Sequence, residues 1–308
     1  MTLVRTSELV RSAVSASGAV VGFNVITLEH AEGIAEGVER AGARAILQIS
    51  ENAVRFHRGR IEPILAGCAQ VAEQSSAKLS IHLDHFEDLA LTERAIDVAR
   101  DLGASSIMVD AARLDHDHNV AQTRESAKHA HLHGLWVEAE LGEIGGKDGA
   151  HAPGVRTDPI EARDFVERTC VDGLAVAVGS SHAMTTKDAQ IDIGLIEKLR
   201  ESVPVPLVLH GSSGVDDSRL AEAVRAGIRK VNVGTALNIG FTQQIREFLG
   251  GHPDITDPRK YLDGARSSIS DSVAHLCAVV DEATSSPQAL AQWATGGRSS
   301  VGAPVEPN

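Results

Sequence analysis

A chain of 308 residues with a net charge of −13 at pH 7 lacks the clustered lysine and arginine of a nucleic-acid surface, so we expect no nucleic-acid partner. The length fits one large α/β domain, and 43% hydrophobic residues support a sizeable core, which must be mainly aliphatic because only 3% of residues are aromatic. The sequence has no run of about 18 apolar residues, so we expect no membrane span.

Residues 1–18 have the spacing of an amphipathic helix and lack the continuous apolar region of a signal peptide. Cys68, Cys170 and Cys277 are isolated from one another and odd in number. This pattern favours reduced thiols over a disulfide framework. We therefore expect a cytoplasmic protein.

Short apolar segments rich in β-branched residues alternate with amphipathic segments along the rest of the chain. Glycine ends four of the helical segments, where a left-handed C-cap belongs; these are Gly42, Gly103, Gly134 and Gly227. Strands are expected at 19–26, 43–50, 77–85, 105–111, 135–142, 173–180, 206–213 and 228–235.

Repeated strand–helix units predict a parallel sheet, and eight of them favour closure into a (β/α)8 TIM barrel of the α/β class. A doubly wound open sheet is the alternative, but no G-x-G-x-x-G opens a helix after a strand. We expect one barrel domain over 1–285, with extra C-terminal helices around 239–251 and 267–284 packed on its outside. The Ser-, Gly- and Pro-rich segment 286–308 is expected to be disordered.

In such a barrel the chemistry lies at the carboxyl ends of the strands. His85, His182 and His210 follow strands 3, 6 and 7. Any one of them could be an ordinary hydrogen-bonded histidine, but imidazoles from different strands are the usual ligands of a catalytic zinc ion. Carboxylates lie at the same rim: Asp84, Asp110, Glu138 and Glu140. The sequence therefore predicts a metal site there.

Three further segments bear on the site. The small residues of "HGSSG" (210–214) and "NVGT" (232–235) leave backbone N–H groups open to an anion, as in the phosphate site of many barrels. The glycine-rich segment 140–154 is either an ordinary long loop or a lid that carries an acid/base. The histidine-rich 114–118 could contact the site, whereas 128–134 reads as solvated surface, at worst an adventitious metal binder.

None of the lysines is well placed to form a Schiff base with a substrate at this rim. Lys78 and Lys230 open strands 3 and 8, at the end of the barrel away from the site, and Lys187 lies well beyond strand 6.

Together these residues resemble the class II, zinc-dependent fructose-bisphosphate and tagatose-bisphosphate aldolases. The resemblance runs from Gly22 to Leu262 through "IHLDH", "SIMVDA", "VEAELGEIGG", "AVAVGSSH", "LVLHGSSG" and "KVNVGT", one motif for each strand end. It implies reversible cleavage of a ketose bisphosphate into dihydroxyacetone phosphate and glyceraldehyde 3-phosphate. Such chemistry passes through an enediolate, which a divalent cation stabilises. It also implies a homodimer or homotetramer.

The resemblance implies roles for individual residues. His85, His182 and His210 match the zinc ligands, and Asp110 and Glu140 match acidic groups that support the metal or hold a second divalent ion. Asp84 matches the acid/base that handles the proton of the hydroxyl at the bond being broken. Independently of the resemblance, we expect His82 to be a supporting neighbour of Asp84. The substrate contacts implied are Asn24, Gly211, Ser213, Asn232 and Thr235, with Ser50 and Arg259 reaching the far phosphate.

Three departures from the family pattern bear on the substrate. The family usually has a glutamate after the paired glycines of this loop, as the base that takes the carbon-bound proton. Here the sequence is "GGKDG", so Asp148, one methylene shorter, is the nearest candidate. Ala183 replaces the glycine that serves a phosphate and a monovalent cation, Na⁺ or K⁺, and no acidic residue flanks Thr235. The alternatives are an aldolase for another phosphorylated ketose or sugar acid, as in inositol catabolism, a zinc hydrolase, and a sugar-phosphate-binding barrel with weakened catalysis.

Overall fold

The computed structural model describes residues 2–141, 156–180, 187 and 189–285, and its centre is a closed barrel of eight parallel strands in sequence order. The predicted (β/α)8 barrel is thereby confirmed. Each strand lies within its predicted segment apart from the last residue of β3. The strands are β1 (Val20–Asn24), β2 (Arg44–Ser50), β3 (Lys78–Phe86), β4 (Ser106–Val109), β5 (Trp136–Glu140), β6 (Gly173–Ala175), β7 (Leu207–Leu209) and β8 (Ile228–Val233).

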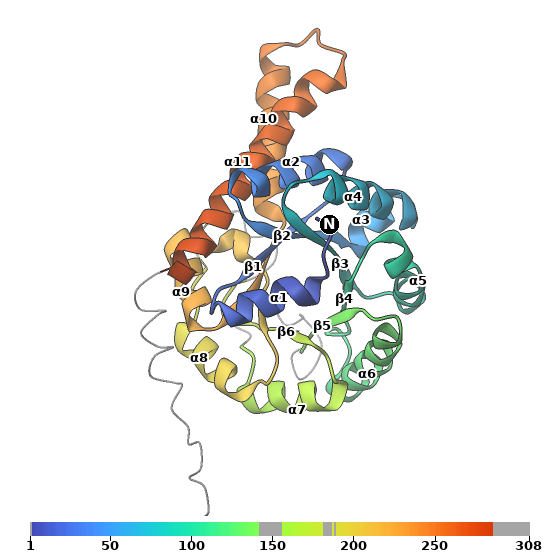
Figure 1. The fold of residues 1–308 in the computed structure, drawn as a ribbon, viewed down its shortest axis with the longest axis vertical. Coiled ribbons are helices and arrows are strands. Elements are labelled where there is room, and N and C mark those ends of the chain that lie inside the picture. The colour runs from blue at the N-terminus through green and yellow to red at the C-terminus, as the bar shows by residue number, and fades with distance from the viewer. Residues whose placement is uncertain (1, 142–155, 181–186, 188, 286–308) are drawn as a thin grey trace, which may run out of the picture.

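A ring of helices surrounds the barrel (Figure 1). The helices are α1 (Thr6–Ser15), α2 (Leu28–Arg40), α3 (Glu51–Phe56), α4 (Glu62–Gln74), α5 (Leu89–Ala99), α6 (His116–Leu132), α7 (Pro159–Thr169), α8 (Ile193–Ser202), α9 (Asp217–Ala226), α10 (Thr235–Gly251) and α11 (Pro258–Ser285), with short 3-10 turns η1 (Arg100–Leu102) and η2 (Ser212–Gly214). The four glycines expected at helix ends all have positive φ. Within the part of the chain that the structure describes, no helix is both long and apolar enough to cross a membrane.

The amphipathic helix α1 covers the end of the barrel at which the strands begin (Figure 1). Its apolar face, Leu9, Val10 and Ala13, packs against residues inside the barrel, among them Val20 and Ile46. The interior at this end is therefore a packed apolar layer, and the polar interior residues described below lie nearer the other end.

Asp side chains begin the five helices from α5 to α9. Each accepts a hydrogen bond from a backbone N–H in the first turn; the residues are Asp88, Asp115, Asp158, Asp192 and Asp216. These caps fix the point at which each loop on the active face ends, so they help to position that face.

The C-terminal helices only partly follow the prediction that they pack on the outside of the barrel. Helix α11 buries Ala265, Ile269, Val273 and Cys277 among others, and it runs along α2 and α9. In α10 only Leu237 is buried. The far half of α10 and the start of α11 form a helical hairpin that projects beyond the barrel (Figure 1). The predicted tail 286–308 lies outside the described residues.

Helices α2 and α11 pack closely because α2 presents glycine at successive turns. A methyl group added at Gly37 would lie 2.5 Å from the backbone oxygen of Ser270 and 2.7 Å from the Cβ of Val273. Gly37→Ala is therefore expected to destabilise the protein by about 1–3 kcal/mol through overpacking, against a propensity gain of about 1 kcal/mol. Urea unfolding measures the net loss.

Gly67→Ala in α4 is the matched control for this prediction. Its added methyl meets only the Cδ1 of Leu28, at an ordinary 3.5 Å, so this variant should keep the propensity gain and be as stable as the wild type or more so. The packing explanation is wrong if Gly37→Ala gains stability in the same way.

Candidate active site

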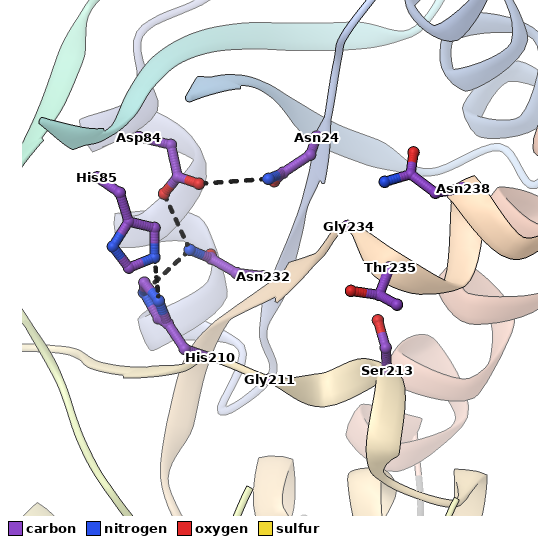
Figure 2. Close-up of a pocket in the computed structure, with 10 residues that line it drawn as sticks. All are labelled: Asn24, Asp84, His85, His210, Gly211, Ser213, Asn232, Gly234, Thr235 and Asn238. Carbon is purple, nitrogen blue, oxygen red and sulfur yellow. Dashed lines mark hydrogen bonds between the residues drawn. The ribbon is translucent and has the colours of Figure 1, made fainter. Parts of the chain in front are cut away.

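A cavity of about 150 Å³ opens where strands β1, β3, β7 and β8 end. Most of the substrate and metal residues predicted from the sequence meet there (Figure 2). The lining residues are Asn24, Asp84, His85, His210, Gly211, Ser213, Asn232, Gly234, Thr235 and Asn238. Asn238 was missed by the sequence prediction, although it lies one turn after Thr235 on the same helix.

A bulge in β3 lets two consecutive residues face this cavity. Adjacent residues on a regular strand point to opposite faces, so Asp84 and His85 cannot both do so without a break. The pairing with β4 shifts between Leu83 and Phe86 by one extra residue on β3, and His85 has a φ of +51°. Positive φ is costly for a residue with a side chain, and here it turns the imidazole toward the site.

His85 and His210 face each other across the cavity (Figure 2). The Nε2 of His85 lies 2.9 Å from the Nδ1 of His210. On the outer side of each ring a carboxylate accepts a hydrogen bond: Asp110 at 2.8 Å from the Nδ1 of His85, and Glu138 at 2.8 Å from the Nε2 of His210. An ionised carboxylate can only accept, so the outer nitrogens carry the hydrogens. The inner nitrogens share a hydrogen bond with each other, and once a metal ion displaces that hydrogen both can donate a lone pair to the ion.

This donor set fits a divalent metal ion. The Glu140 carboxylate completes a group of three ligand atoms, with His85 and His210, that all lie within 4.8 Å of one another. Histidine ligands whose outer nitrogen is held by a carboxylate are typical of zinc sites. His182, the third predicted imidazole, lies outside the described residues.

The charge around His85 also favours a cation. Burial alone would lower the pKa of this imidazole, but the carboxylates of Asp84 and Asp110 outweigh burial and raise the pKa to about 10. A positive charge is thus stabilised at this position, whether it is a proton or a metal ion.

Asp84 is 2% exposed, and two amides hold its carboxylate. The Nδ2 of Asn232 lies 3.4 Å from one oxygen and the Nδ2 of Asn24 lies 3.5 Å from the other. Gln48 in turn donates to the Oδ1 of Asn24 at 3.0 Å. Burial raises the pKa of Asp84, while the positive charges of His85 and Lys230 act in the opposite direction. A buried carboxylate held in this way can take up and return a proton.

His82 lies next to Asp84 inside the barrel but belongs to the layer beneath the cavity. Its Nδ1 lies 2.8 Å from the Oγ of Ser106, and its Nε2 is 3.8 Å from the Oδ1 of Asp84. Burial holds the pKa of His82 well below its usual range, so the ring is neutral and packs beneath the site.

A buried ion pair between β5 and β8 lies under His210. The Nζ of Lys230 is 2.9 Å from the Oε2 of Glu138 and 2.6 Å from the Oδ1 of Asn232, and both charged side chains are fully buried. The expectation that Lys230 lies at the wrong end of the barrel is therefore wrong. Strand β8 begins at Ile228, two residues before Lys230. Lys230 therefore lies within the strand, and its side chain extends through the barrel interior toward the site.

This ion pair could have been predicted. Residues at every second position along a strand share a face, and Lys230 shares the face of Asn232 just as Glu138 shares that of Glu140. The Lys230 amine is bound by Glu138 and Asn232 and does not line the cavity, which still argues against a Schiff-base lysine.

At the other end of the cavity, small residues surround the start of α10. Gly211, with a φ of +65°, opens η2, and the Oγ of Ser213 accepts a hydrogen bond from the N–H of Ala236 at 3.0 Å. Gly234 precedes α10, and a methyl group there would lie 3.2 Å from the Nδ2 of Asn24. The first N–H groups of a helix attract anions, so this end is suited to a phosphate.

The structure does not bring every predicted residue to the cavity. Ser50 ends β2, and its hydroxyl accepts a hydrogen bond from Ala53 at 3.1 Å as the N-cap of α3. Arg259 is 89% exposed near the start of α11 and pairs with Asp257 at 2.8 Å. Asp148 and Ala183 lie outside the described residues. His118, in the segment 114–118, bonds to Asp115 at 2.6 Å and is exposed.

Comparisons with known proteins find relatives with the same fold. The chain is 26% identical to a putative fructose-1,6-biphosphate aldolase from Coccidioides immitis, over 91% of this chain and 97% of that one, with a TM-score of 0.79. It is 27% identical to the YdjI aldolase of Escherichia coli K12, over 90% and 97%, with a TM-score of 0.74. A fructose-bisphosphate aldolase from Campylobacter jejuni shares the fold, at 18% identity over 89% and 93%, with a TM-score of 0.73.

The family model described as fructose-bisphosphate aldolase class-II matches residues 4–285, nearly the whole described chain. With that match, the chain belongs to the class II fructose-bisphosphate aldolase family and is an enzyme of the aldehyde-lyase type.

Proposed function

We propose that this enzyme is a zinc-dependent aldolase that reversibly cleaves fructose 1,6-bisphosphate or tagatose 1,6-bisphosphate into dihydroxyacetone phosphate and glyceraldehyde 3-phosphate, as in glycolysis. One observation carries the proposal. The imidazole rings of His85 and His210 face each other with nitrogens 2.9 Å apart, and a carboxylate binds the outer nitrogen of each ring. They lie beside the buried Asp84 in a cavity that reaches the N-terminus of α10.

In this proposal His85, His182 and His210 hold the zinc ion, and Asp110 and Glu140 support it or hold a second divalent ion. When bound, zinc supplies Lewis-acid stabilisation of the negative charge that develops on the substrate oxygens. The further cofactor is a monovalent cation, Na⁺ or K⁺, near the substrate phosphate.

Asp84 accepts the hydroxyl proton as the adjoining carbon–carbon bond breaks, and returns it in the reverse direction. Asp148 is proposed to supply and remove the carbon-bound proton of the triose phosphate. The amides of Asn24 and Asn232 orient Asp84, since both lie within about 3.5 Å of its oxygens.

One substrate phosphate is proposed to lie at the start of α10, among Gly211, Ser213 and Thr235, with Asn232 beside it. Ser50 and Arg259 are proposed to reach the other phosphate. We also propose that the protein acts in the cytoplasm as one domain over 1–285, with a disordered tail over 286–308. A homodimer or homotetramer is proposed, for which the projecting α10–α11 hairpin offers a surface (Figure 1).

A panel of ketose monophosphates, ketose bisphosphates and phosphorylated sugar acids, each assayed with and without zinc, tests the substrate. Release of a triose phosphate from fructose or tagatose bisphosphate is the expected result. Faster cleavage of a monophosphate or a sugar acid selects the alternative aldolase. Release of inorganic phosphate alone indicates a hydrolase. Zinc binding with no turnover indicates a sugar-phosphate-binding barrel.

A further inference from the structure

A second group of potential metal ligands lies on the outside of the barrel, where α5 and α6 end. The Nε2 of His129 lies 3.1 Å from the Oδ1 of Asp97, and the Nε2 of His133 lies 3.6 Å from the same oxygen. Asp97 is in the last turn of α5, His129 is in the last turn of α6, and His133 is the C-cap of α6. Two imidazoles thus converge on one carboxylate oxygen.

The helix explains this convergence. Residues four apart lie one above the other on a helix surface, so His129 and His133 form a pair with ring centroids 5.0 Å apart. The neighbouring helix α5 supplies the third group from across the helix–helix groove. The carboxylate that approaches the pair is therefore fixed by the barrel fold and not by local sequence.

The spacing suits a transition-metal ion. All three ligand atoms lie within 4.8 Å of one another. Bonds of 2.0–2.1 Å in a tetrahedral zinc site place neighbouring ligand atoms about 3.3 Å apart, which lies between the two observed nitrogen–oxygen distances. The side chains are between 33% and 58% exposed, so an ion can enter from solvent and water can complete its coordination.

From this geometry we propose that Asp97, His129 and His133 form a second metal site that binds a divalent transition-metal ion such as Zn²⁺. Imidazole and carboxylate together favour Zn²⁺, Ni²⁺ and Cu²⁺ over Mg²⁺ and Ca²⁺. Helices α5 and α6 end where the strands begin, so the site lies at the face opposite the catalytic rim. Its ion would link two helices and take no part in cleavage.

His131, two residues after His129 on α6, provides a matched control. Its Nε2 bonds to the Oδ2 of Asp172 at 2.9 Å, and this oxygen also accepts the N–H of Val137 at 2.8 Å. Among the described residues His131 belongs to neither group of potential metal ligands. Its removal takes one imidazole from the same surface and leaves the proposed site intact.

Equilibrium dialysis of the full chain at micromolar free zinc, followed by metal analysis, tests the proposal. The double variant His129→Ala/His133→Ala should bind one zinc ion fewer than the wild type, whereas His131→Ala should bind as many. Asp97→Asn should weaken the same site by about tenfold or more, since even loss of an outer-shell partner costs 10- to 100-fold. Aldolase activity should be unchanged in all of them.

Equal zinc content in the double variant and in His131→Ala would overturn the proposal, as would loss of an ion from His131→Ala. Thermal unfolding gives an independent reading that does not depend on activity. Adding zinc should raise the melting temperature of the wild type and of His131→Ala more than that of the double variant, because bound metal stabilises the folded state. Equal shifts in all three proteins would also contradict the site.

Discussion

Replacing Asp84 by alanine is expected to lower the rate of aldol cleavage by about 10²- to 10⁴-fold, the usual contribution of a positioned acid/base, while zinc stays bound. Asp84 is buried beside His85 and its carboxylate is held by two amides within about 3.5 Å, so the alanine variant keeps these amides but loses the group proposed to accept the substrate hydroxyl proton. The proposed zinc ligands His85 and His210 remain in this variant, so the protein should still bind zinc. Rate and metal content are measured on the same preparation.

Asn24→Ala is the graded control for Asp84. It removes one of the two amides but leaves the carboxylate, so its effect on the rate should be smaller than that of Asp84→Ala. If Asp84→Ala instead loses its zinc, Asp84 serves the metal and its assignment as the proton carrier is wrong.

Replacing Lys230 by methionine is expected to destabilise the protein by about 3–5 kcal/mol, because it leaves the charge of Glu138 buried without its cation. Both side chains are fully buried in the barrel interior, with 0% exposure. The free energy of unfolding in urea measures the loss.

A double-mutant cycle separates the ion pair from general packing. Glu138→Gln/Lys230→Met removes both charges and should recover much of the stability that Lys230→Met loses. Strictly additive losses would mean that the two charges do not stabilise each other. Glu138→Gln should also weaken zinc binding by about 10- to 100-fold, because Glu138 holds the outer nitrogen of His210.

The strand-end residues could be predicted from the sequence because a parallel barrel gathers the carboxyl ends of its strands on one rim. His85 and His210 lie 125 residues apart in the chain, yet the periodic pattern alone places both at that rim. Because adjacent residues on a regular strand face opposite ways, Asp84 and His85 can share one site only where the strand is interrupted. The break is a bulge within β3, since the strand continues to Phe86, and not the start of a loop.

Contacts between helices could not be predicted in the same way, unlike the buried ion pair inside the barrel. The Lys230–Glu138 pair is a different case. Strand β8 begins at Ile228, as expected, so Lys230 lies within the strand, and the alternation of side chains along β8 and β5 could have placed both charged groups inside the barrel. The approach of Asp97 to His129 and His133 depends on how two helices lie side by side, which no spacing within one helix encodes. Arg259 shows the same limit, because a motif match says nothing about the projecting hairpin that carries it.

The most direct test of the account is the rate of triose phosphate release from the preferred ketose bisphosphate before and after treatment with a zinc chelator. We expect cleavage to be lost on chelation and restored by added zinc, equally in the wild type and in His129→Ala/His133→Ala, because the proposed catalytic ion is held by His85 and His210 and not by the second site. Cleavage that continues at its full rate in the chelator, with no zinc left on the protein, would contradict the metal-dependent mechanism.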